Sequence, residues 1–184
     1  MKKFFVMIIV VLLSGCVDES STHPERKEAR CEDSKACSTA LKYVTYDEQG
    51  AAHKLFEMQL TDENDKDSQR YKNEADANEH IKPDYEKFKD KKITNYAVLE
   101  YETITNKVFI YKFRFKNLRE NKVINRYLRV EKIDGKYLVK RYNNFVPNST
   151  ITRGDKIVPY VKYYAKGMSL QAKEELEPKP IEKE

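Results

Sequence analysis

The sequence lacks tryptophan and has only three histidines and three cysteines among its 184 residues. No histidine stands at the spacing of a catalytic or metal-binding motif. The nearest approach is His53 with Glu57 one helical turn later, a pair more typical of a surface helix contact. The sequence therefore predicts no catalytic residue, no metal site and no cofactor. Thirteen tyrosines and eight phenylalanines supply the bulky side chains, so we expect a tyrosine-rich aromatic core.

The sequence also has little excess charge, although 35% of its residues are charged. Without residues 1–15, which contain Lys2 and Lys3, the chain has 33 basic and 30 acidic residues, a formal charge of +3. We interpret this charge as spread almost evenly, so the near balance of basic and acidic residues predicts a solvated surface of mixed sign. It excludes the basic footprint that a nucleic-acid-binding protein needs, so nucleic acid is not an expected partner.

No apolar stretch is long enough to span a bilayer. The stretch Phe4–Leu13 has ten residues and follows two lysines, which is typical of a cleaved export signal. It ends in Leu-Ser-Gly-Cys at residues 13–16, and this sequence resembles the lipobox of bacterial lipoproteins. The alternative is an ordinary secretory signal with an incidental cysteine.

The lipobox resemblance implies a membrane anchor at Cys16. In that family the thiol of the matching cysteine receives a diacylglycerol, the signal is cut just before it, and the new amine is usually acylated. Residues 1–15 would then be the signal peptide, and two or three acyl chains would give a durable anchor. Val17, in place of an aspartate, implies by the enteric sorting pattern the periplasmic face of the outer membrane, if the host is Gram-negative. The polar sequence 17–30 is expected to be a flexible tether.

Two further cysteines, Cys31 and Cys37, enclose a short polar segment. In an oxidising compartment so close a pair is expected to form a disulfide, which stabilises by roughly 2 kcal/mol in the chain-entropy model. Free thiols and a metal site are the alternatives, although the spacing is neither Cys-x-x-Cys nor that of a zinc knuckle. We therefore predict a lipidated tether with a disulfide loop over 16–37, one domain over 38–170, and a disordered charged tail over 171–184.

The first half of the predicted domain contains two helix signals. Thr45 with an acid three residues later forms a capping box, and the apolar spacing that follows predicts a helix over 46–60, with a strand as the rival. The charged stretch 61–80 has almost nothing to bury and is expected to lie outside the core, as a solvated helix or a loop. Pro83 then indicates the first turn of a short helix that ends near Lys92.

The second half alternates between apolar and polar residues. The alternation predicts a four-stranded antiparallel meander with strands over 95–104, 108–116, 123–133 and 137–145. Asp134-Gly135, between the last two strands, is typical of a two-residue hairpin turn. The apolar spacing from Val161 to Met168 predicts a C-terminal helix that packs on the domain.

The first hairpin of the meander has two possible registers. A three-residue turn over 105–107 places Leu99 opposite Phe113 and Glu100 opposite Lys112. A two-residue turn places Glu100 among the inward-facing aromatic residues instead. Because burying carboxylates is costly, we predict the three-residue turn.

Helices followed by a four-stranded meander, together with the Ile-Asp-Gly-Lys-Tyr hairpin, resemble the NTF2-like (cystatin-like) α+β cone over about residues 40–145. Some members of that superfamily are enzymes that use Asp, His or Tyr in the mouth of the cone, and many only bind small molecules or partners. The candidate pocket residues on this interpretation are Tyr101, Tyr111, Phe113 and Arg126. Arg126 either meets an acidic ligand or stacks on Tyr111, or a bulge turns it outward.

These observations predict a membrane-anchored envelope lipoprotein that acts as a binding or assembly module for an unidentified envelope protein or small ligand. One alternative is a small NTF2-like hydrolase or isomerase, and another is an inhibitor or immunity lipoprotein. A deep pocket with converging Asp, His and Tyr side chains would favour catalysis, whereas a filled cone would favour binding.

Overall fold

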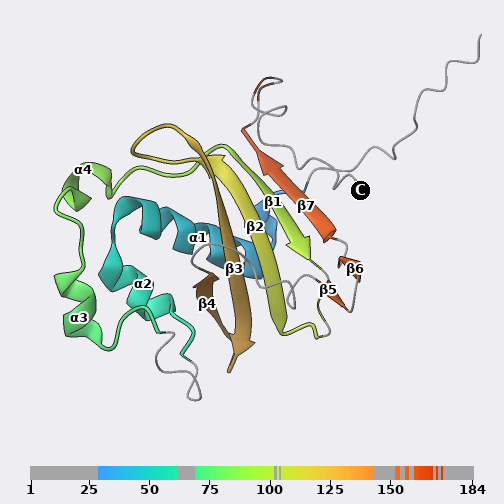
Figure 1. Ribbon diagram of the computed structural model, residues 1–184, viewed down its shortest axis with the longest axis horizontal. Helices are drawn as coiled ribbons and strands as arrows, with labels where there is room; N and C mark the ends of the chain where they lie inside the picture. Colours follow the sequence, from blue (N-terminus) through green and yellow to red (C-terminus); the bar gives the residue numbers. More distant parts are fainter. Residues whose placement is uncertain are drawn as a thin grey trace, which may run out of the picture.

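The computed structural model describes residues 29–61, 69–101, 103, 105–142, 152–153, 156–157, 160–167, 169 and 171. The predicted signal peptide over 1–15, the lipidation site Cys16, the tether before Ala29 and the predicted tail after Gln171 lie outside the described residues. The described chain has the predicted α+β class, with helices on one side of an antiparallel sheet. In Figure 1 the helix α1 (Lys35–Gln49) crosses behind the sheet.

The chain enters the fold through a short 3-10 turn, η1 (Cys31–Asp33), and then forms α1. Ser34 caps α1, because its hydroxyl accepts a hydrogen bond from the backbone N–H of Cys37 (3.3 Å). Gly50 ends the helix in the left-handed conformation, with φ of 81°. The predicted helix over 46–60 is therefore wrong in its start and its continuity. Thr45 is no cap, since its hydroxyl donates to the carbonyl of Leu41 one turn back within α1 (2.8 Å).

Three shorter helices lie on the helical side in the described part of the chain: α2 (Ala52–Met58), α3 (Glu74–Glu79) and α4 (Tyr85–Phe88). The last of them lies within the short helix predicted after Pro83. The prediction that 61–80 lies outside the core is wrong for Tyr71 and Ala77, which are both buried. Tyr71 is held by Gln59, whose side-chain amide both donates to its carbonyl (2.8 Å) and accepts from its N–H (3.0 Å).

The predicted meander is present as four strands: β1 (Tyr96–Tyr101), β2 (Val108–Lys116), β3 (Val123–Ile133) and β4 (Lys136–Tyr142). The bounds of β2 and β3 are those predicted. Asp134 and Gly135 have φ of 48° and 79°, the two positive values that a two-residue turn of this kind requires.

A fifth strand, β7 (Tyr160–Lys166), pairs antiparallel with β1 where a C-terminal helix was predicted, and the sheet order is β4-β3-β2-β1-β7. The prediction of a helix is wrong because Tyr163 and Ala165 pack on one side of the sheet and Tyr164 on the other. Pairing with the open edge of β1 thus overrides the helical spacing. A separate two-stranded ribbon joins β5 (Thr152–Arg153) to β6 (Lys156–Ile157).

The register of the first hairpin is also not the predicted one. Val98 lies opposite Phe113, and Glu100 lies opposite Tyr111, which is the pairing of the two-residue turn. Glu100 therefore faces α1, whereas Leu99 and Tyr101 lie on the other side of the sheet. The predicted cost of burying Glu100 is offset by hydrogen-bond partners, one of which comes from β7.

Both edges of the sheet carry a short parallel bridge. Ala29 pairs with Tyr164 on β7, and Gln59 pairs with Val139 on β4. These bridges cover part of the backbone groups that an edge strand leaves unpaired. Between the sheet and α1 lies the predicted aromatic core, whose largest fully buried side chains include Tyr96, Tyr111, Phe113 and Phe115.

Candidate functional site

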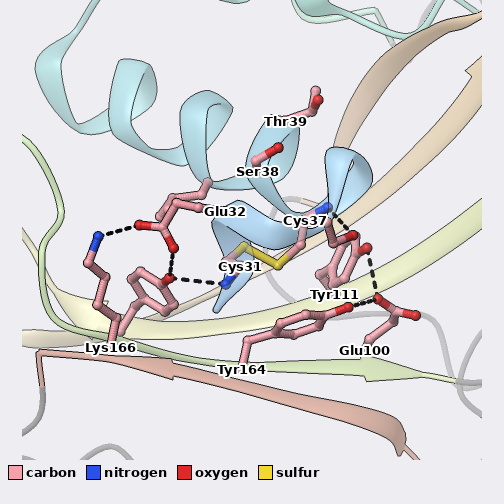
Figure 2. The surroundings of a disulfide bond; sticks show 12 residues. Cys31, Glu32, Cys37, Ser38, Thr39, Glu100, Tyr111, Tyr164 and Lys166 are labelled. Atoms are coloured by element: carbon pink, nitrogen blue, oxygen red, sulfur yellow. Dashed lines mark hydrogen bonds and ion pairs between the residues drawn. A yellow bond between two sulfur atoms is a disulfide. The ribbon is translucent and has the colours of Figure 1, made fainter. Parts of the chain in front are cut away.

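Cys31 and Cys37 are joined by a disulfide at the start of α1, with an S–S distance of 2.07 Å. Both cysteines are 0% exposed and belong to the main core cluster. The disulfide therefore lies inside the folded unit, whereas the predicted boundaries placed it in the tether over 16–37. Figure 2 shows it beside several polar side chains from the sheet.

Glu100 is a buried carboxylate close to this disulfide. The hydroxyls of Tyr111 and Tyr164 both donate to its Oε2 atom (3.0 and 2.7 Å), and the two rings converge on it in Figure 2. The Nζ atom of Lys162 lies 3.8 Å from Oε1. Only 6% of Glu100 is exposed, so these partners replace the water that the charge loses on burial.

The two tyrosines act as hydrogen-bond donors and not as bases. Burial raises the pKa of the Tyr111 hydroxyl, and the charge of Glu100 raises it further. Burial and the hydrogen bond to Glu100 likewise raise the pKa of Tyr164. Both hydroxyls therefore keep their protons at neutral pH. The cluster holds β7 and β2 against β1 and offers no activated nucleophile or base.

A second polar group ties the start of the described chain to β7. The hydroxyl of Tyr96 donates to Glu32 (2.5 Å) and accepts a hydrogen bond from the N–H of Cys31 (3.2 Å). Lys166 forms an ion pair with the other oxygen of Glu32 (2.5 Å). Burial alone would raise the pKa of Glu32, but the bonds from Lys166 and Tyr96 outweigh it and hold that pKa below its ordinary value.

Arg126 lies on the inner side of β3 and reaches α1. Its Nη2 atom is 3.2 Å from Oε1 of Glu48, and its Nε atom is 3.8 Å from Oδ2 of Asp47. Arg141 and Arg70 also pair with Asp47, at 2.6 and 2.7 Å. The bulge that would turn Arg126 outward is not present, since β3 pairs with β2 without a register shift.

Three of the four candidate pocket residues are neighbours on the inner side of the sheet, since the rings of Tyr111 and Phe113 lie 6.0 Å apart and Phe113 is opposite Arg126, but they enclose no open space between them. Tyr111 and Phe113 are 0% exposed and fill the space between the sheet and α1. Arg126 is occupied by acidic residues of the same chain. Tyr101 lies on the opposite side, in a second cluster with Leu99, where burial raises the pKa of its hydroxyl to about 12. The change of register separates Tyr101 from the other candidate residues, because it moves Tyr101 to the other face of β1.

The histidines are structural where they are described. His53 packs edge-on against Tyr85, with ring centroids 5.5 Å apart, and His80 forms a hydrogen bond with the backbone carbonyl of Asp76 (2.7 Å). Within the described ranges, no three His, Cys, Asp or Glu side chains are grouped to hold a metal ion. No helix in the described part of the chain is long and apolar enough to cross a membrane.

The side of the sheet that faces away from α1 is rich in cations, which the overall charge balance did not reveal. The segment Val108–Tyr142 has eleven lysines and arginines and three acidic residues. Strand alternation places six of these cations on the outer side, and we call them the basic sheet face: Lys112, Arg114, Lys116, Arg129, Lys136 and Lys140. A charge count along the chain, in place of a total, would have detected this segment.

No protein-family model matches the chain, and neither a curated protein nor a solved structure matches it.

Proposed function

We propose that this chain is a membrane-anchored envelope lipoprotein whose domain acts as a binding or assembly module for an envelope component. The observation that carries the proposal is the Cys31–Cys37 disulfide, which is built into the core at the start of α1. Disulfides of this kind persist in oxidising compartments. The disulfide therefore supports the export that the Leu-Ser-Gly-Cys sequence at residues 13–16 predicts.

The side chains between the sheet and α1 make their contacts within the fold, and this supports a binding role in preference to a catalytic one. Tyr111 and Phe113 pack against α1 with no exposed surface. Arg126 and the neighbouring arginines are engaged by Asp47 and Glu48. A hydrolase or isomerase of the NTF2-like type would direct such side chains into a pocket. Here they make internal contacts, so a partner would be recognised on the outside of the domain.

Labelling with palmitate tests the anchor directly. The protein is produced in a bacterial host supplied with labelled palmitate, and label per molecule is measured after immunoprecipitation. We expect the unchanged chain to be labelled and Cys16→Ser to remain an unlabelled precursor. The double variant Cys31→Ser/Cys37→Ser is the matched control, since it removes the other two cysteines and should keep the label. Undiminished labelling of Cys16→Ser would refute the anchor.

A further inference from the structure

The basic sheet face is an array of positive charge on one side of the sheet. Outward residues of one strand are about 7 Å apart, and neighbouring strands are about 4.8 Å apart, so cations on three adjacent strands form one continuous patch. Figure 1 shows β2 and β3 side by side in front of α1. The helices thus cover the inner side of the sheet. On the outer side, residues of β1, β2 and β7 form a buried cluster that includes Leu99, Ile110 and Tyr163. The cations of the basic sheet face lie beside this cluster, and they are half-buried except for the exposed Lys136.

The charge on this face is strongly one-sided. Within β2, β3 and β4, Glu131 is the one acidic residue, and it pairs with Arg129. Two other arginines of these strands, Arg126 and Arg141, point inward and are matched by acidic residues of α1. Acidic residues of α1 therefore pair with these two inner cations, and the outer side of the three strands has six cations and one carboxylate.

Aromatic residues lie among these cations. Tyr127 and Tyr142 are directly opposed on β3 and β4, and the Nζ atom of Lys112 lies 5.7 Å from the centre of the Tyr127 ring. Tyrosine is favoured at the level of lipid headgroups, because its ring is apolar and its hydroxyl is polar. Lysine, arginine and tyrosine on one side of the sheet together match the chemistry of an anionic membrane surface.

We propose that the basic sheet face docks onto anionic phospholipid headgroups of the membrane in which the chain is anchored. This proposal rests on the lipid anchor proposed above. Twelve residues separate Cys16 from Ala29, and a flexible chain of that length spans about 20 Å. Ala29 bridges to β7 at the edge of the sheet. A tether of that length would keep the domain within reach of the headgroups.

Vesicle sedimentation tests this docking without the lipid anchor. The probe is the chain from Val17 onward, which keeps every described residue. We expect it to bind phosphatidylcholine vesicles that contain about 30% phosphatidylglycerol, and not vesicles of phosphatidylcholine alone. Binding should fall several-fold when salt is raised from about 0.05 M to about 0.3 M, because screening shortens the reach of the charges.

Two charge-reversal variants separate the face from overall charge. Lys112→Glu/Arg114→Glu/Lys136→Glu should lower the affinity for anionic vesicles by about 100-fold or more, since each cation near such a surface contributes roughly fivefold. The matched control reverses three exposed lysines on the helical side and should change the affinity by less than about threefold: Lys72→Glu/Lys87→Glu/Lys92→Glu. Circular dichroism checks that both variants fold, and the corresponding glutamine variants replace any that does not.

Equal losses in the two charge-reversed chains would overturn the proposal, as would failure of the folded, unchanged chain to bind anionic vesicles. Binding to single-stranded DNA or an anionic glycan with none to vesicles would overturn it too. The palmitate result separates the two proposals. Labelling without vesicle binding refutes only the docking face, and vesicle binding without labelling refutes only the anchor.

Discussion

Removal of the Tyr164 hydroxyl should destabilise the domain, because it takes one of two donors from the buried Glu100 carboxylate. The hydroxyl lies 2.7 Å from Oε2 of Glu100, and a hydrogen bond to a charged group contributes about 1.5–3 kcal/mol. Tyr164→Phe should therefore lower the free energy of unfolding by about 2 kcal/mol, out of the roughly 5–15 kcal/mol that a domain has. Tyr111→Phe should have a similar effect, since its hydroxyl is also bonded to Glu100 (3.0 Å).

Urea unfolding at neutral pH, followed by circular dichroism, measures these losses. The double variant Tyr111→Phe/Tyr164→Phe should lose more than the sum of the single changes, because the second change leaves the carboxylate without a hydroxyl donor. Tyr127→Phe, on the outer side of the sheet, is the control and should change stability by less than about 0.5 kcal/mol. Losses below about 1 kcal/mol for the double variant would refute the register, since Glu100 would then lie on the solvent side opposite Lys112.

Alkaline pH should destabilise the domain through its buried tyrosines, whose pKa values are raised above 10. The three that donate to a carboxylate give the size of the effect: Tyr96, Tyr111 and Tyr164. The contribution of these three tyrosines to the free energy of unfolding is complete below pH 10. Above pH 10 it is lost at about 1.4 kcal/mol per tyrosine per pH unit, which is about 4 kcal/mol for the three near pH 11. A melting temperature that stays constant from about pH 9 to 11 would contradict this. Phe113→Ala should cost about 3–5 kcal/mol in denaturant unfolding and Lys112→Ala at most about 1, whereas equal costs would contradict the assignment of faces. Mass spectrometry without reduction should find the peptide with Cys31 and Cys37 two hydrogens lighter than its reduced form, and alkylation of both thiols would exclude the bridge.

The local signals in the sequence predicted the local structure well. Alternation set the bounds of β2 and β3, and Asp134-Gly135 formed the two-residue turn it predicts. The pair Cys31 and Cys37 is bridged in the structure. Each of these features depends on residues close together in the chain, so a short window contains the information that determines it.

The errors in the sheet concern partners that are far apart in sequence. Burying Glu100 is predicted to be costly, and the donor that offsets this cost, Tyr164, is 64 residues away in a segment predicted to be a helix. That segment forms a strand because β1 offers it an unpaired edge, which its own apolar spacing cannot reveal. Arg126 faces inward for a similar reason, since Asp47 and Glu48 of α1 compensate its charge.

The basic sheet face was missed for a different reason. The segment Val108–Tyr142 has a large excess of cations, but the total charge of the chain is only +5, because acidic residues are concentrated elsewhere. A total hides such an asymmetry, whereas the fold collects the cations of three strands on one side.

The proposal that a lipid at Cys16 holds this domain at a membrane is best tested by the intact mass of the protein extracted from bacterial membranes. We expect a chain that begins at Cys16 and is heavier than its sequence by a diacylglyceryl group and an amide-linked acyl chain. A chain that keeps residues 1–15, or that begins at or beyond Cys16 with no added lipid mass, would contradict it.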